Sequence, residues 1–181
     1  GHPVPSRRAV MAMFDPEIRA LAARVVEENR RAGRRIATAE SCTGGLVAAA
    51  ITAIPGSSDV LDRGFVTYSD PSKVELLGVS EEILMTLGAV SEATAWAMAR
   101  GAIAKSAADV AVSISGIAGP GGGSEKKPVG TVVFARAERA ADGSGPAEEG
   151  PSLADVHHLG DLGRDEIRRQ AVLIALRLLL P

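Results

Sequence analysis

The sequence has few of the residues on which several common kinds of protein depend. Cys42 is its one cysteine, so no internal disulfide can form and a structural zinc site of several thiolates is excluded. Both absences fit a reducing cytosol, so the expected location is cytoplasmic. No apolar run is long enough to cross a bilayer, and the first ten residues lack the apolar stretch of a signal peptide. No membrane partner is therefore expected.

Aromatic residues and excess charge are also scarce. Aromatic side chains make up 3% of the sequence, and the formal net charge is −2. Strong non-specific binding to DNA or RNA needs a basic surface, and binding of single strands also uses aromatic stacking. We therefore expect no nucleic-acid partner, although a local basic pocket is compatible with this net charge.

Histidine occurs three times, at His2, His157 and His158. His2 belongs to Gly1-His2, which is typical of a cloning scar. The other two are neighbours on a predicted strand, so their side chains point to opposite faces and make a poor metal site. A thiol at a helix N-terminus can be a nucleophile, but a cysteine hydrolase normally needs a histidine base. We interpret Cys42 as a small packed residue and expect no metal and no cofactor.

The 181 residues, 46% hydrophobic and 23% charged, suit one globular domain. Strands alternate with helices early in the chain and follow one another near its end. This order predicts a single α/β domain over 14–181, a three-layer α/β/α arrangement around a mixed sheet, after an N-terminal extension over 1–13. Helices are predicted from Pro16 to a cap at Gly33, from Leu46 to 54, and over 71–77, 81–87, 92–104 and 164–180, and strands over 34–40, 64–68, 110–115, 129–135 and 155–159.

The segment 137–152 is rich in Ala, Gly, Glu and Pro. This composition predicts a mobile excursion between two strands that contributes little to function. The two strands on either side of it have no helix between them, so they should form an antiparallel pair.

A sharp turn at Ala39-Glu40-Ser41-Cys42-Thr43-Gly44-Gly45 is predicted to join a strand end to a helix start. The first N–H groups of a helix have no internal partners, and two glycines let the backbone approach a ligand closely. The turn is therefore a candidate site for a phosphate or an oxyanion, with Ser41 at the strand end. The alternative is that Ser41 or Thr43 merely caps the helix.

Tyr68 ends the next predicted strand, and a turn at Ser69-Asp70-Pro71 should bring Lys73 back beside it. A lysine in a partly dry pocket can have a lowered pKa and accept a proton from a serine hydroxyl. Serine–lysine pairs are a known variant of the nucleophile and base. The alternative is an exposed helical lysine and a half-buried tyrosine.

A glycine-rich loop runs from Ser115 to Ser124 and is followed by Lys127-Pro128-Val129-Gly130. Its N–H groups could wrap a phosphate or a ribose, with Gly116, Gly119 and Gly121 as the candidate contacts and Lys127 as a further phosphate ligand. The loop matches neither a dinucleotide fingerprint nor a Walker loop, because no helix clearly follows it. The alternative is a flexible surface loop.

Taken together, these segments resemble the CinA C-terminal domain family of nicotinamide mononucleotide amidohydrolases. The resemblance covers about 16–180, and the matching pieces are AESCTGG at 39–45, GFVTYS at 64–69 with Lys73, GIAGPGG at 116–122, KPVGTV at 127–132, and Gly160-Asp161 with Arg164, Ile167 and Arg168. One departure is Asp70, where the family often has asparagine.

The resemblance implies hydrolysis of nicotinamide mononucleotide to nicotinate mononucleotide and ammonia. It also implies a Ser–Tyr–Lys centre, here Ser41, Tyr68 and Lys73, in a homodimer that needs no metal. We expect Thr43, Gly44 and Gly45 to contribute to the oxyanion site. Two alternatives stay open: a catalytically silent nucleotide-binding or regulatory module associated with the competence or DNA-damage response, and a structural or partner-binding protein linked to DNA uptake or repair.

Overall fold

A computed structural model describes residues 12–148 and 153–181 of the chain. Residues 1–11 of the predicted N-terminal extension lie outside these ranges, and the domain boundary at residue 14 stays a prediction. The elements are α1 (Pro16–Ala32), β1 (Ile36–Glu40), α2 (Leu46–Thr52), the short 3-10 helix η2 (Ser57–Asp59), β2 (Leu61–Val66), α3 (Asp70–Leu77), α4 (Glu81–Leu87), α5 (Glu92–Ala104), β3 (Val110–Gly116), β4 (Thr131–Glu138), β5 (Leu153–His158) and α6 (Arg164–Leu178). None of the helices in the described ranges is long and apolar enough to cross a membrane.

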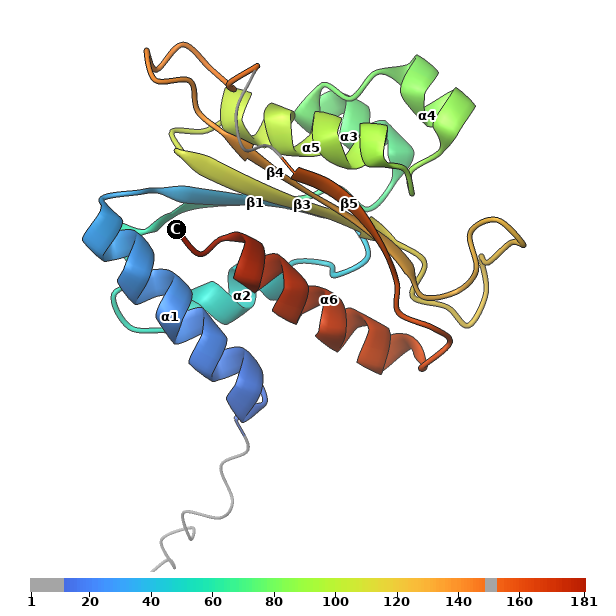
Figure 1. Ribbon diagram of the computed structural model, residues 1–181, viewed down its shortest axis with the longest axis horizontal. Coiled ribbons are helices and arrows are strands. Elements are labelled where there is room, and N and C mark those ends of the chain that lie inside the picture. Colours follow the sequence, from blue (N-terminus) through green and yellow to red (C-terminus); the bar gives the residue numbers. More distant parts are fainter. Residues whose placement is uncertain (1–11, 149–152) are drawn as a thin grey trace, which may run out of the picture.

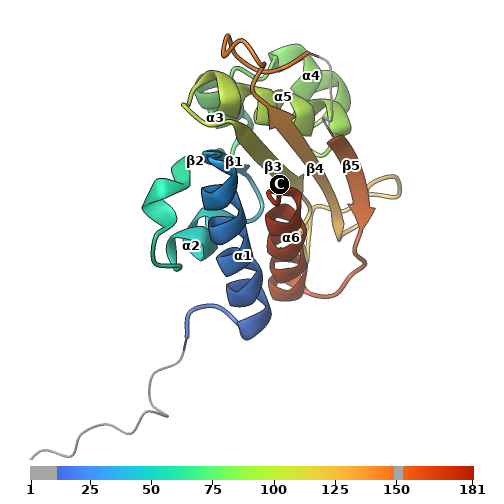
Figure 2. The same cartoon turned by 60° about the vertical axis from the view of Figure 1, so that its left-hand side comes forward.

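Within the described residues, the strands form one mixed sheet in the order β2-β1-β3-β4-β5. The strand β1 pairs in parallel with β2 and β3, whereas β4 pairs antiparallel with β3 and β5. Helices α1, α2 and α6 cover one face of the sheet, and α3, α4 and α5 lie on the other (Figures 1 and 2). The predicted three-layer fold, with the antiparallel pair at its end, is confirmed.

The helix boundaries follow the capping residues of the sequence. Asp15 accepts a hydrogen bond from Ile18 N at the start of α1, and Gly33 ends that helix in the left-handed conformation. Ser91 caps α5 in the same way as Asp15 caps α1. The strand β2 begins three residues before the predicted position, because the pairing with β1 extends back to Leu61. The strand ends at Val66, so Tyr68 lies beyond it.

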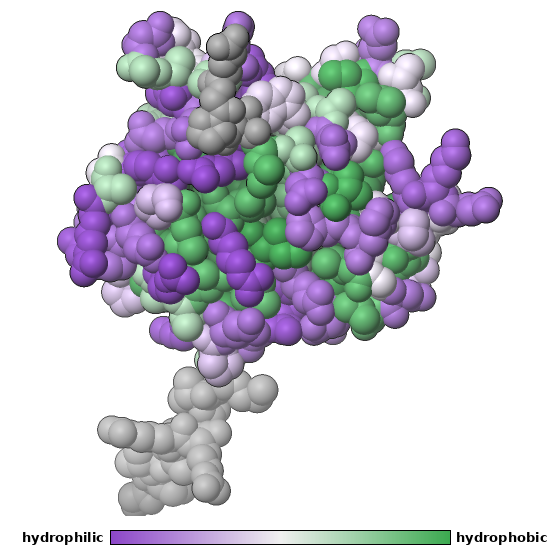
Figure 3. Space-filling view, viewed as in Figure 1, coloured by the Kyte–Doolittle hydropathy of each residue, from purple (hydrophilic) through white to green (hydrophobic). Residues whose placement is uncertain are grey.

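Two apolar clusters fill the space on either side of the sheet. Ile36, Val112 and Phe134 pack toward α1, α2 and α6, while their neighbours Ala37, Ala111 and Val133 pack toward α5. This alternation is expected when successive side chains of a strand point to opposite faces. Apolar side chains also reach the surface in the middle of the face that carries α1 and α6 (Figure 3).

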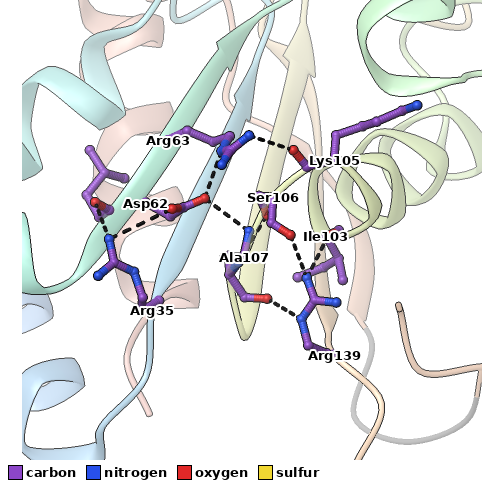
Figure 4. Close-up of polar contacts among 10 residues, drawn as sticks. Arg35, Asp62, Arg63, Ile103, Lys105, Ser106, Ala107 and Arg139 are labelled. Atoms are coloured by element: carbon purple, nitrogen blue, oxygen red, sulfur yellow. Dashed lines mark hydrogen bonds and ion pairs between the residues drawn. The ribbon is translucent and has the colours of Figure 1, made fainter. Parts of the chain in front are cut away.

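At the amino ends of the parallel strands, polar contacts tie the chain to itself (Figure 4). Asp62 Oδ2 accepts hydrogen bonds from Ala107 N at 3.1 Å and Arg63 Nε at 2.8 Å, and Arg63 donates to the Lys105 carbonyl. The connection from α5 to β3 is therefore held at this end of the sheet. The opposite end, where the carboxyl ends of β1 and β3 meet, carries the candidate site.

The segment 137–152 differs from the prediction. The strand β4 continues through Ala137, which is 1% exposed, to Glu138. The guanidinium of Arg139 then donates to the carbonyls of Ala108, Ile103 and Ser106, each at 2.8 Å (Figure 4). The prediction of a mobile excursion from residue 137 onward is thus wrong for its first three residues, because composition does not reveal these contacts. Residues 149–152 lie outside the described ranges.

Candidate active site

The site lies where two crossover connections leave the sheet and pass over its opposite faces. From β1 the chain passes through α2 on one face, and from β2 it passes through α3, α4 and α5 on the other to reach β3. The carboxyl ends of β1 and β3 are adjacent, and Ser41 N donates to Ile114 O at 2.8 Å across them. A crevice at such a reversal is the usual ligand site of an open α/β sheet.

The turn after β1 depends on two glycines. Gly44 and Gly45 have φ angles of 59° and 100°, which L side chains rarely adopt. The N–H of Gly44 donates back to Ser41 O at 3.0 Å and closes the turn. The sequence therefore places Ser41 at the tip of β1, with 7% of its surface exposed.

Lys73 is buried although it lies on a short helix. Ser69 caps α3 by accepting from Ser72 N, and the first turn of the helix then directs Lys73 inward, where it is 1% exposed. Its Nζ lies 3.0 Å from Ser41 Oγ, 2.8 Å from Thr67 O and 3.1 Å from Tyr68 O. Burial lowers the pKa of Lys73, because a charged ammonium loses solvation there.

These three contacts suit a lysine that works as a base. The two carbonyl oxygens can only accept, so they orient two N–H bonds of Lys73. The third direction points to Ser41 Oγ, which can donate its proton to the lone pair of a neutral amine. The predicted approach of Lys73 to Tyr68 is confirmed, and the alternative of an exposed helical lysine is wrong.

Tyr68 reaches Lys73 through its backbone, not through its ring. The side chain is 61% exposed, and its Oη accepts a hydrogen bond from Arg164 Nη2 at 3.2 Å. The direct contact between Lys73 and Ser41 leaves no room for a hydroxyl between them. The resemblance implies a Ser–Tyr–Lys centre, but in this structure the backbone carbonyl of Tyr68 contacts Lys73 and its phenol lies at the rim of the pocket.

Ser41 and Lys73 open onto a small pocket of about 170 Å³. The strand ends and two connections contribute to its wall. It is lined by Ser41, Cys42, Tyr68, Lys73, Ala89, Val90, Ser115, Gly116, Ala118 and Arg164.

Two arginines of α6 approach this region, and the sequence reading did not assign them a role. Arg164 Nη1 donates to Gly119 O at 2.8 Å, and Arg168 Nε donates to Cys42 O at 3.1 Å. Both lie in the first turns of α6, where the helix dipole disfavours a cation. Two arginines four residues apart at such a position are a signal that could have marked them as functional.

Glu40 is another residue to which the sequence analysis assigned no role. It is fully buried at the end of β1, and its carboxylate accepts from the hydroxyl of Thr43 and from the N–H groups of Val47 and Ala48. Burial raises the pKa of Glu40, and the hydrogen bonds oppose that rise. The N–H groups of Val47 and Ala48 in the first turn of α2 are therefore already occupied by this carboxylate.

The predicted substrate-binding residues divide between two places. Thr43, Gly44 and Gly45 follow Ser41 in the turn, and Gly116 lines the pocket beside it. Gly119 accepts the hydrogen bond from Arg164.

Gly121 and Lys127 lie elsewhere. Gly121 lines a separate groove together with His158 and Asp161. Lys127 Nζ donates to the Leu87 carbonyl at 2.7 Å and does not line the Ser41 pocket. The structure thus ties Lys127 to the end of α4 and does not bring it to the pocket.

Cys42 fits its interpretation as a packed residue. It is 6% exposed, and burial raises the pKa of its thiol to about 11. In the described part of the chain, no cluster of three or more His, Cys, Asp or Glu side chains could hold a metal ion.

Comparisons with known proteins agree with this fold. A family model described as the CinA C-terminal domain matches residues 18–181. Nicotinamide-nucleotide amidohydrolase PncC from Escherichia coli (strain K12) is 49% identical over 167 residues, which are 92% of this chain and 95% of that protein. A relative from Symbiobacterium thermophilum is 55% identical over 144 residues, 80% of this chain but 33% of that longer protein.

Among solved structures, the competence/damage inducible protein CihA from Agrobacterium tumefaciens has a TM-score of 0.85 and 48% identity. The match covers 93% of this chain and 97% of that one. A family model that spans most of the sequence and a solved relative with the same fold place this chain in the CinA C-terminal domain family.

Proposed function

We propose that the protein hydrolyses the carboxamide of nicotinamide mononucleotide to give nicotinate mononucleotide and ammonia. The observation that carries this proposal is the buried lysine with its Nζ 3.0 Å from Ser41 Oγ. A serine with an adjacent neutral amine is a nucleophile and base suited to an amide. The similarity to an amidohydrolase over nearly the whole chain supports the same reaction class.

In the first step, neutral Lys73 takes the proton of Ser41 Oγ as that oxygen attacks the carboxamide carbon. The resulting lysine ammonium then returns this proton to the nitrogen of the tetrahedral intermediate, the C–N bond breaks, and ammonia leaves. The short distance between Lys73 and Ser41 supports a direct transfer in both directions. Tyr68 then has a different role, which is to hold Arg164 at the rim of the pocket.

The oxyanion of the intermediate needs N–H donors beside Ser41. Gly44 N donates a hydrogen bond to Ser41 O, and the N–H groups of Val47 and Ala48 donate to the Glu40 carboxylate. Among the described residues, the N–H groups of Cys42 and Thr43 have no acceptor, so they are the donors that we assign. One such donor contributes about 3 kcal/mol in other hydrolases.

Water completes the reaction by attacking the acyl-serine, and Lys73 acts again as the base. The proton that Lys73 takes from water passes to the departing Ser41 Oγ. The product is a carboxylic acid with one oxygen from the amide and one from water, and it becomes nicotinate when it loses its proton to solvent or to the released ammonia. No step requires a metal ion or a cofactor.

The pocket is small compared with the roughly 300–1,000 Å³ of most ligand sites. It therefore accommodates the carboxamide end of a nucleotide, and the phosphate lies outside it. Arg164 lines the pocket and offers a fixed guanidinium, since Gly119 O and Tyr68 Oη both hold it at the rim. We assign the 5′-phosphate to Arg164, in place of Lys127.

Arg164→Ala should raise KM for nicotinamide mononucleotide by about 10- to 100-fold, because it removes a charge-assisted hydrogen bond. The effect on kcat should be much smaller, since Arg164 forms its hydrogen bonds with Gly119 O and Tyr68 Oη, and not with Ser41 or Lys73. Steady-state kinetics would separate the two parameters. Lys127→Ala is the matched control and should leave KM nearly unchanged. If Lys127→Ala raised KM more than Arg164→Ala does, the phosphate would be assigned to Lys127 and the glycine-rich loop instead.

The function itself is tested by ammonia release from nicotinamide mononucleotide by the purified protein. We expect equal rates with and without EDTA, because serine and lysine supply the chemistry. Loss of turnover in EDTA that one divalent ion restores would overturn the mechanism. Binding of the nucleotide without ammonia release would favour the alternative of a silent binding or regulatory module. The homodimer and the cytoplasmic location stay predictions.

A further inference from the structure

Glu40 is a buried ionisable residue that the proposed mechanism does not use. It is 0% exposed, and its Oε1 accepts from Thr43 Oγ1 at 2.7 Å and from Val47 N at 2.9 Å. Its Oε2 accepts from Ala48 N at 3.1 Å. Every partner donates, so the ionised carboxylate matches this environment better than a carboxylic acid does.

These contacts span the nucleophile turn. Glu40 precedes Ser41 in the chain, while Thr43, Val47 and Ala48 follow it. One side chain therefore ties the strand end to both the middle of the turn and the first turn of α2. Ser41 lies between the tied points, with its Oγ on Lys73.

The turn carries two side chains capable of nucleophilic attack. Ser41 and Cys42 are adjacent, and both line the pocket. A thiol beside a helix N-terminus usually becomes more acidic and more reactive. At Cys42 the opposite holds: burial raises the pKa of the thiol, and the negative charge of Glu40 adds to the rise. The carboxylate also occupies N–H groups whose partial positive charge would otherwise favour a thiolate.

We propose that Glu40 is a positioning residue that makes Ser41, and not Cys42, the reactive nucleophile of the turn. It does so in two ways. Its hydrogen bonds hold Ser41 Oγ against Lys73, and its charge adds to the burial that keeps Cys42 unreactive. The first effect rests on the proposed function, because it is measured as turnover. The second is independent of any substrate.

Glu40→Gln is the direct test, because glutamine has the same shape and no charge. Its amide nitrogen donates, so it cannot accept from both N–H groups that Glu40 binds. We expect kcat for nicotinamide mononucleotide to fall by about 10- to 100-fold, as for loss of a hydrogen bond to a charged group, and KM to change by less than about twofold. Alkylation of Cys42 by iodoacetamide at pH 8 should accelerate about tenfold for each unit by which the thiol pKa falls.

Two controls accompany this variant. Glu75→Gln removes an exposed carboxylate from α3 and should alter neither turnover nor alkylation. Cys42→Ala in the Glu40→Gln background should abolish the alkylation, which assigns the signal to that thiol. Circular dichroism and thermal unfolding would show whether each variant is folded.

A pair of substitutions at Thr43 keeps the test decisive if Glu40→Gln does not fold. Thr43→Val removes the hydroxyl that donates to Glu40, while Thr43→Ser retains it; both keep the backbone N–H. Of the two variants, Thr43→Val should show the lower kcat and the faster alkylation of Cys42, because it alone lacks the hydroxyl that donates to Glu40.

The proposal is overturned if folded Glu40→Gln keeps native kcat and native alkylation of Cys42, or if the two Thr43 variants behave alike. A native protein that releases no ammonia would contradict the proposed function instead. The alkylation rates would then still report on Glu40, so the two failures are distinguishable.

Discussion

Ser41→Ala should lower kcat for nicotinamide mononucleotide by about 1,000-fold or more, as removal of the nucleophile does in other serine hydrolases. The physical reason is that no other side chain of the pocket combines a nucleophilic atom with a base at hydrogen-bond distance. Ser41 Oγ lies 3.0 Å from Lys73 Nζ, whereas Cys42 has a thiol whose pKa burial raises to about 11. Ammonia release at saturating substrate measures the effect. Binding of the nucleotide should persist.

Cys42→Ala is the matched comparison, since the two residues are neighbours on the same turn. We expect this variant to keep most of its turnover and to lose a little stability, because a buried thiol is replaced by a smaller group. If Cys42→Ala abolished turnover in a folded protein while Ser41→Ala did not, the nucleophile would be Cys42. The pairing of Lys73 with Ser41 would then be structural.

Local signals made most of the fold predictable from the sequence. Asp15 and Ser91 cap their helices as expected, because a side-chain oxygen at these positions satisfies a free N–H whatever the rest of the chain does. The alternation of strands and helices gave the parallel pairs of β1, and the missing helix before β5 gave the antiparallel pair. These features depend on neighbours in the sequence.

The parts that were missed depend on long-range contacts. Arg139 looked like part of a polar excursion, and only the position of α5 provides the three carbonyls that hold it (Figure 4). Tyr68 was predicted to end a strand, but β2 stops at Val66 and the phenol contacts Arg164, which lies 96 residues further along the chain. Lys127 was assigned to a phosphate from its loop alone, and the end of α4 competes for it.

The candidate centre was predictable in part, for a related reason. Ser41 and Lys73 are separated by 32 residues, and the Ser69-Asp70-Pro71 turn was enough to bring the lysine back toward Tyr68. The sequence did not decide whether Lys73 is buried, because a charged residue on a short helix is usually exposed. A lysine held in a dry site is unfavourable for folding while it is charged, which is typical of a group retained for chemistry.

Lys73→Arg should lower kcat by about 100-fold or more, the range expected for loss of a general base, and Lys73→Met should do the same. Arginine keeps the charge but does not lose its proton in a protein, so it cannot accept one from Ser41. Methionine has a similar length and no charge, so it serves as the matched control for burial. Near-normal turnover by Lys73→Arg, with a dead Lys73→Met, would mean that position 73 supplies charge and that the base is elsewhere.

The pH dependence of the native protein tests the same assignment without a substitution. Burial lowers the pKa of Lys73 below its unfolded value of about 10.4. Turnover should therefore fall as the pH drops through the lowered pKa, where the base becomes protonated, and rise with a single ionisation above it. Between the folded and unfolded pKa values the unfolded chain binds more protons, so the free energy of unfolding should also rise with pH across that window. Denaturant titrations at several pH values should show this rise in the native protein and not in Lys73→Met. If the free energy of unfolding changes with pH in the same way in both proteins, while turnover of the native protein still depends on a single ionisation, the group that controls turnover is not Lys73.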